Sequence, residues 1–104
     1  MSFYRLRVPD QIVGFVRALH PDIKRKIKGS LKIIAAEPNA GKFLKDELEG
    51  LRSFHVGKFR IVYRMAKPRE IQIVAIGPRD RIYEETYRLI GKEDKVNIES
   101  RKGN

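Results

Sequence analysis

The sequence has no cysteine and no tryptophan among its 104 residues, and only two histidines that stand far apart. Without cysteine it can form neither a disulfide bond nor a thiolate metal site, which fits a reducing compartment. Two distant histidines do not predict a zinc site. No apolar run approaches the roughly 20 residues of a membrane span, and the N-terminus lacks the apolar segment of a signal peptide. We therefore expect a cytoplasmic protein without a metal or other cofactor.

Acidic residues are also scarce relative to basic ones. The chain carries 13 Asp and Glu against 23 Lys and Arg, which gives a formal net charge of +10. A field of this sign attracts polyanions, either nucleic acid or an acidic protein segment. The alternative is a surface charge that serves only solubility.

The length suits one domain with a single core, which we place at residues 1–91. The polar residues 92–104 are predicted to form a flexible tail. Periodicity predicts a strand over 3–8, followed by two helices, one starting at Pro9-Asp10 and one ending before Pro38. The remaining segments with strand character are 43–51 leading into 53–56, then 58–65 and 70–76, before a short C-terminal helix or arm over 83–90.

This order of elements predicts an α+β fold. Two antiparallel N-terminal helices should pack on one face of a small, mostly antiparallel, twisted sheet. His20 precedes Pro21 in the turn between the helices, and we expect it to be structural. Asp46, Glu47 and Glu49 are expected to face solvent, because no other carboxylates cluster with them. Gly41-Lys42 lacks the rest of a phosphate-binding loop.

The segment RSFHVGKFRIVYR, residues 52–64, contains five basic side chains and no acid. Its central Val-Gly-Lys-Phe suits a two-residue type II′ hairpin turn, because glycine stands at the first central position. In that register His55 lies opposite Arg60. Alternation then divides the side chains between two faces. Those expected on the core side are Phe54, Val56, Phe59, Ile61 and Tyr63, and those on the opposite side are His55, Arg60, Val62 and Arg64.

Two potential cations on neighbouring strands repel each other unless an anion lies between them. Arg60 could bind a phosphate bidentately, and its charge lowers the pKa of His55, which favours the neutral form that acts as a base. The alternative is that these long side chains spread into water at little cost. The same hypothesis extends to a second basic cluster, where Gly77-Pro78 ends a strand and displays Arg79 and Arg81. Tyr83 follows it, either as a stacking surface or as a cover for the core edge.

The segments LEGLRSFHVGKFRIVYRM and VAIGPRDRIYEETYRLI resemble the RelE/ParE toxin superfamily of toxin–antitoxin systems. The resemblance covers about residues 1–90 and is most specific over 48–83. It implies a RelE-like fold and a toxin that cuts messenger RNA on the ribosome with basic residues and a tyrosine. It also implies neutralisation by a cognate acidic antitoxin. ParE-like relatives inhibit DNA gyrase, and a basic RNA-binding module without catalysis is a third possibility.

The resemblance assigns roles to particular residues. Arg60 and Arg79 match the family's phosphate-binding arginines, and Tyr83 falls near its C-terminal tyrosine, with Tyr87 as a competitor. Ser53 and His55 stand where the family usually has basic residues, so this chain departs from the pattern there. We expect Arg60, Arg79, His55 and Tyr83 to be catalytic, with His55 as acid or base. The further basic residues expected to contact RNA are Lys45, Arg52, Lys58, Arg64 and Arg81.

Overall fold

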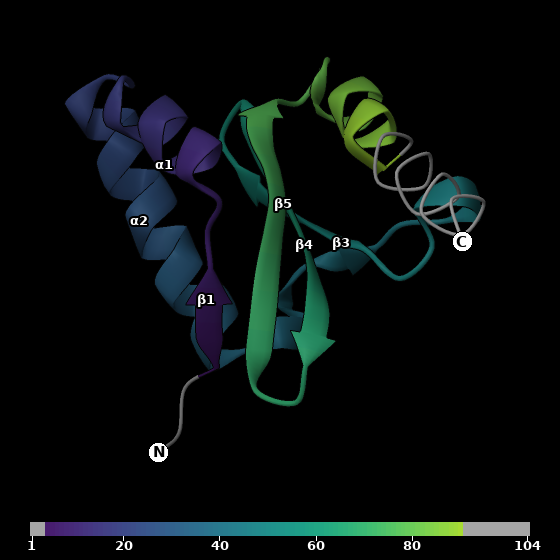
Figure 1. Ribbon diagram of the computed structural model, residues 1–104. Helices are drawn as coiled ribbons and strands as arrows, with labels where there is room; N and C mark the ends of the chain where they lie inside the picture. The colour runs from purple at the N-terminus through teal and green to yellow at the C-terminus, as the bar shows by residue number, and fades with distance from the viewer. Residues whose placement is uncertain (1–3, 91–104) are drawn as a thin grey trace, which may run out of the picture.

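The computed structural model describes residues 4–90, and the predicted tail at 92–104 lies outside them (Figure 1). A five-stranded sheet in the order β1-β5-β4-β3-β2 forms the centre of the molecule. Two helices, α1 (Asp10–Arg17) and α2 (Pro21–Ala36), lie on one side of it. The strands are β1 (Arg5–Arg7), β2 (Lys42–Phe43), β3 (Arg52–Val56), β4 (Phe59–Lys67) and β5 (Glu70–Pro78). A C-terminal helix occupies residues 82–90. The predicted α+β fold is confirmed.

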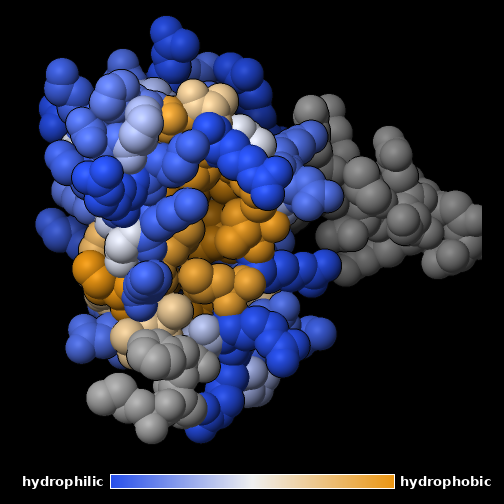
Figure 2. Space-filling model, turned by 90° about the vertical axis from the view of Figure 1, so that its left-hand side faces the viewer, coloured by the Kyte–Doolittle hydropathy of each residue, from blue (hydrophilic) through white to orange (hydrophobic). Residues whose placement is uncertain are grey.

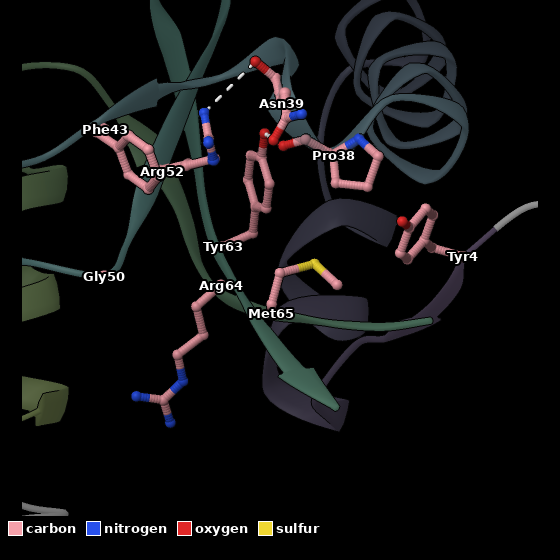
Figure 3. A pocket seen from close by; sticks show the side chains of 9 residues that line it. All are labelled: Tyr4, Pro38, Asn39, Phe43, Gly50, Arg52, Tyr63, Arg64 and Met65. Carbon is pink, nitrogen blue, oxygen red and sulfur yellow. Dashed lines mark hydrogen bonds between the residues drawn. The ribbon is translucent and has the colours of Figure 1, made fainter. Parts of the chain in front are cut away.

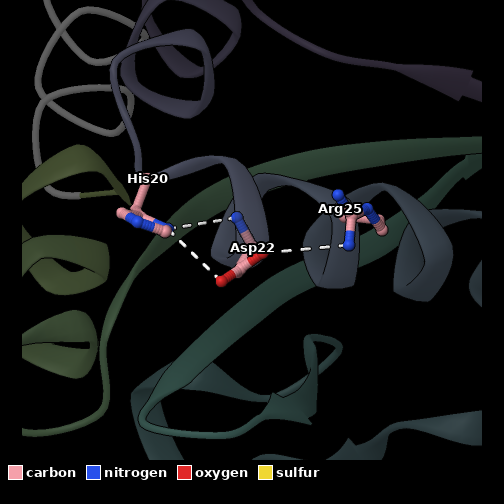
Figure 4. A network of polar contacts seen from close by, with 3 residues as sticks. All are labelled: His20, Asp22 and Arg25. Carbon is pink, nitrogen blue, oxygen red and sulfur yellow. Dashed lines mark hydrogen bonds and ion pairs between the residues drawn. The ribbon is translucent and has the colours of Figure 1, made fainter.

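The two N-terminal helices meet at a proline turn, and His20 caps the second one. The backbone N–H of Asp22 donates to His20 Nδ1 over 3.2 Å, which satisfies one of the unpaired donors at the start of α2. Figure 4 shows that Asp22 also lies between His20 and Arg25, at 3.8 Å from each. His20 is therefore engaged as a helix cap.

The main core lies between α1, α2 and the sheet. Ile27 and Ile34 of α2 pack against Val56, Ile61 and Tyr63, on the face that strand alternation assigned to the core. Phe54 and Phe59 pack against the edge of this cluster. The predicted core face of the hairpin is thus confirmed.

The opposite face of the sheet has a smaller core of its own. Val62 lies on that face, as predicted, but it is fully buried together with Leu48, Leu51, Ala75 and Ile82. The C-terminal helix supplies Ile82, and the loop between β2 and β3 supplies the two leucines. The sheet is therefore covered on both faces, although by only a few residues on this one.

The segment 43–51 was expected to be a strand, and most of it is not. Strand β2 ends at Phe43, and a 3₁₀ turn, η2 (Asp46–Leu48), follows. Asp46 and Gly50 have φ values of +58° and +91°, which bend the chain back so that Leu44 N–H donates to Leu51 O over 2.9 Å. The acidic residues and glycine of this segment favour turns over strands. The prediction was wrong because it considered only the alternation of apolar and polar residues.

The outer edge of β5 is only partly covered. Strand β1 pairs in parallel with β5 from Glu70 to Gln72, and no other described strand pairs with the rest of that edge. A hollow of about 400 Å³ lies beside it, lined mainly by α1, β5 and the C-terminal helix. Figure 2 shows hydrophobic side chains gathered in a depression ringed by hydrophilic ones. Among the described helices, none is long and apolar enough to cross a membrane.

Candidate active site

The β3–β4 hairpin has the register that the sequence predicted. His55 pairs with Arg60, and Val56 pairs with Phe59 across the turn. Gly57 adopts φ +60°, as the first central residue of a type II′ turn requires. Cross-strand pairing places the two side chains on the same face, opposite the main core.

Arg60 is held close to the hairpin turn. Its side chain is largely buried, at 9% exposure. Arg60 Nη1 donates to the carbonyl oxygen of Phe59 over 3.1 Å and to that of Gly57 over 3.5 Å. These bonds to the backbone limit the freedom of a long side chain, so the guanidinium has a defined place beside the exposed His55.

Arg79 is brought to the same end of the sheet by the strand that follows. Its backbone N–H donates to Lys58 O over 2.8 Å, which ties the segment after β5 to the hairpin turn. The positive charge of Arg79 acts on His55. Arg60 and Arg79, which are 19 positions apart in the sequence, thus belong to one cluster with His55.

Lys42 is a member of this cluster that sequence reasoning missed. It is the first residue of β2 and pairs directly with Ser53, so its side chain lies on the face of Ser53 and His55. Its charge also acts on His55. In the sequence, Lys42 is a single basic residue in a strand of only two residues. A strand this short shows no alternating pattern from which the face of Lys42 could be predicted. We call Lys42, His55, Arg60 and Arg79 the cationic cluster.

The surroundings of His55 favour its neutral form. Desolvation by neighbouring protein atoms and the charges of Arg60, Lys42 and Arg79 all lower its pKa below the ordinary value of 6.5. Each of these effects acts in the same direction, because desolvation and nearby cations both penalise the imidazolium. These effects favour the neutral imidazole of His55 at neutral pH.

Tyr83 reaches the cluster through Ser53. The Tyr83 hydroxyl donates to Ser53 Oγ over 3.3 Å. Ser53 is almost fully buried and lies two residues before His55 on β3, on the same face of the sheet. Tyr83 is the second residue of the C-terminal helix, whose first residue, Ile82, is packed into the smaller core. Tyr87 lies one turn further along and is more exposed. The bond to Ser53 ties the Tyr83 hydroxyl to the face of the sheet that carries His55.

The other basic residues predicted to contact RNA do not form one surface. Arg52 lies on the opposite face of the sheet, where it is bonded to backbone carbonyls. Arg64 shares the face of Arg60 but is four residues away, roughly 13 Å at strand spacing, and its Nε donates to Gln72 over 3.0 Å. Lys45, Lys58 and Arg81 are exposed and lie on turns and loops.

The cationic cluster combines an imidazole with three cations, and the phenol of Tyr83 is bonded to Ser53 on the same face of the sheet. Within residues 4–90, no three His, Cys, Asp or Glu side chains gather where they could hold a metal ion. A phosphodiester is the ligand that such a group suits, because cations stabilise a developing phosphorane while a neutral imidazole accepts a proton.

Comparison with known proteins places this arrangement in a family. The model of the ParE toxin of type II toxin–antitoxin system, parDE, matches residues 7–83. The chain therefore belongs to this family, within the RelE/ParE toxin superfamily, and it is a toxin of a type II toxin–antitoxin system. No curated protein matches the sequence.

Solved structures of the superfamily share the fold. The toxin–antitoxin complex RelBE2 of Mycobacterium tuberculosis matches with a TM-score of 0.66 and 26% identity, over 76% of this chain and 94% of that one. The archaeal RelE–RelB complex of Pyrococcus horikoshii matches with a TM-score of 0.62 and 26% identity, over 78% and 99%. A free mutant of the E. coli toxin RelE matches with a TM-score of 0.67 and 17% identity, over 89% and 98%.

Proposed function

We propose that the protein is a metal-free, ribosome-dependent messenger RNA endoribonuclease that inhibits translation. One observation carries this proposal: a histidine with a lowered pKa stands among three cations at one end of the sheet. A protein that only binds RNA needs no titratable group here, because permanently charged side chains are sufficient for binding. A neutral imidazole held among cations is suited instead to accepting a proton next to a phosphate.

The reaction follows from these groups. His55 takes the proton of a ribose 2′-hydroxyl, whose oxygen attacks the adjacent phosphorus. Arg60 and Arg79 stabilise the negative charge of the phosphorane. The bond to the 5′-oxygen then breaks, and that oxygen receives a proton from the Lys42 ammonium. The products are a 2′,3′-cyclic phosphate and a 5′-hydroxyl, and proton exchange with water restores both side chains.

The lowered pKa distinguishes between the two roles considered for His55. A general acid must carry the proton at the start, whereas a histidine with a depressed pKa is largely neutral at pH 7. We therefore assign His55 as the base. Tyr83, fixed by Ser53, positions the nucleotide by stacking or by a hydrogen bond from its hydroxyl.

The partner is a cognate antitoxin. The RelBE2 and RelE–RelB structures that this fold resembles are complexes of a toxin with an antitoxin. The hollow beside β5 supports such a partner here, because Phe15 and Leu89 are exposed around it and, within residues 4–90, no strand pairs with the edge of β5 beyond Gln72. The net charge of +10 favours an acidic partner that associates rapidly at low salt.

A cleavage assay with translating ribosomes tests the nuclease. Wild-type protein should cut messenger RNA, and the Arg60→Ala, Arg79→Ala and Lys42→Ala variants should each cut about 10²–10³-fold more slowly. Lys28→Ala is the matched control, because it removes one exposed charge from α2, outside the cluster. Full-length messenger RNA after prolonged incubation with wild type would reject the proposal, as would equal rates in all variants.

Gyrase inhibition is the second candidate, and the uncharged Ser53 together with the match to the ParE model favours it. A supercoiling assay with purified DNA gyrase separates the two functions. Inhibition of gyrase with intact messenger RNA would support a ParE-like toxin, in which the cationic cluster has no catalytic role.

A further inference from the structure

The short strand β2 presents one residue to each face of the sheet. Lys42 lies on the face of the cationic cluster, whereas Phe43 pairs with Arg52 and lies on the opposite face. Because β2 is the last strand of the sheet, nothing beyond it in the strand order separates the two faces. A flexible strand of nucleic acid could therefore bend around this edge.

Phe43 is the most exposed large hydrophobic residue among those described, at 64%. One face of its ring is covered by Arg52, whose guanidinium carbon lies 3.6 Å from the ring centre. Arg52 Nη1 donates to Gly41 O over 2.8 Å and to Asn39 O over 3.4 Å, so the guanidinium is held in place. Arg52 thus supports a flat aromatic surface (Figure 3).

The side chain of Tyr63 holds the segment that leads into β2 by two hydrogen bonds. The Tyr63 hydroxyl donates to Pro38 O over 2.6 Å and accepts from Gly41 N over 2.9 Å. A Cβ at Gly41 would lie 2.7 Å from that hydroxyl, so the close approach requires glycine. Phe43, Arg52 and Tyr63 line part of a hollow of about 360 Å³, from which Arg64 points away in Figure 3.

We propose that Phe43 is a base-stacking subsite for single-stranded RNA, next to the nucleotide held by the cationic cluster. The ring has the stacking surface, and the exposed cations Lys42 and Lys45 flank it in the sequence, where they can meet the phosphates on either side. Every base has a π-face, so this subsite is tolerant of sequence. Arg52 acts by positioning Phe43, and this explains why an expected RNA-binding residue lies away from the cluster.

The inference rests on the proposed function, but its test does not require cleavage. The protein has no tryptophan, so Phe43→Trp introduces a single fluorescent indole at the subsite. The probe is a 2′-O-methyl RNA hexamer, which lacks the attacking hydroxyl and stays intact. Ile33→Trp is the control, because Ile33 is half exposed on α2. Inorganic polyphosphate supplies negative charge without bases.

We expect the hexamer to quench the indole of Phe43→Trp strongly and that of Ile33→Trp little, and polyphosphate to quench neither. In a separate titration, Phe43→Ala should bind the hexamer roughly 10-fold more weakly than wild type, and Phe43→Tyr should retain binding. Arg52→Ala should weaken binding, and Arg52→Lys should restore it only in part.

Three results would overturn the inference, and the last of them requires an acidic peptide as an additional probe. Equal quenching by polyphosphate would show that charge alone binds there, and an unquenched indole would show that no base reaches Phe43. If the Arg60→Ala variant fails to cleave but Phe43→Trp is unquenched, the subsite is wrong and the nuclease stands. Quenching without any cleavage by wild type would keep the subsite and reject the nuclease. Quenching by an acidic peptide alone would assign Phe43 to a protein partner.

Discussion

The two faces of the β3–β4 hairpin have the same alternating pattern but different uses. On the face covered by α1 and α2, successive inward residues from Val56 to Tyr63 join one continuous core. On the other face, Val62 is buried in a small core, whereas Arg60 and His55, nearer the turn, lie in the cationic cluster. Stability is therefore concentrated on one face, and the other divides its residues between packing and chemistry.

This comparison shows why the cluster can exist at all. Placing Lys42, His55, Arg60 and Arg79 together costs electrostatic free energy, because like charges repel in the folded state. The continuous core behind the sheet offsets that cost, and the pairing of β4 with both β3 and β5 keeps the cations in register. Substitutions on the two faces should consequently affect different measurements.

The largest expected effect on stability is at the main core. Ile61→Ala removes buried methyl and methylene groups and leaves a cavity under α2, so the free energy of unfolding should fall by about 2–5 kcal/mol. Urea denaturation followed by circular dichroism measures this change. His55→Gln, on the neighbouring strand and the other face of the sheet, should leave the midpoint nearly unchanged. Equal losses from the two variants would contradict the division between the faces.

The small core should be less important for stability and more important for the site. Ile82→Ala empties its centre, and we expect a loss of about 2 kcal/mol, because the short C-terminal helix can shift to fill the space. The same shift should move Tyr83 away from Ser53 and slow cleavage several-fold. Urea denaturation and the ribosome assay measure the two effects on the same preparation. A destabilised variant with unchanged cleavage would show that Tyr83 is not needed.

The Tyr63 hydroxyl bonds to the loop before Lys42, so removing this hydroxyl tests whether the main core face holds the loop in place. Tyr63→Phe removes the hydroxyl that bonds Pro38 O and Gly41 N, and unfolding should become easier by about 1–2 kcal/mol. Hydrogen exchange at the Gly41 amide should accelerate, because its acceptor is lost. Protection that stays the same in the variant would mean that another group holds this loop.

The smallest effect is the pH dependence that His55 confers. The pKa of His55 in the folded protein lies below the ordinary 6.5. As the pH falls through 6.5, this histidine is therefore protonated in the unfolded chain before it is protonated in the folded protein. Stability should therefore decline slightly on acidification and level off below the folded pKa, and His55→Gln should remove this slope. Cleavage should persist below pH 6.5 until His55 itself is protonated.

Nuclear magnetic resonance can measure directly how the nearby cations lower the pKa of His55. Lys42→Met removes one of the cations near His55, so the imidazole titration of His55 should move toward 6.5. His20 is the only other histidine and serves as the internal control, because it caps α2 away from Lys42. A His55 midpoint that is the same in wild type and Lys42→Met would contradict the membership of Lys42 in the cluster.

The sequence by itself determined the class of fold, the helices, the hairpin register and the pairing of His55 with Arg60. These features depend on neighbours in the chain: apolar spacing, a glycine at a turn and the two-residue period of a strand. The superfamily also followed from local motifs. The segment 43–51 was the main error, because its turn residues overrode an apparent strand pattern.

Only the tertiary structure decided which distant residues share the site. Lys42 reaches His55 because β2 pairs with β3, and Tyr83 reaches Ser53 because Ile82 is packed into the small core. Arg52, in contrast, turned out to support Phe43 on the opposite face. Contacts between strands and helices far apart in the chain depend on how both faces of the sheet are covered, and no local pattern contains that information.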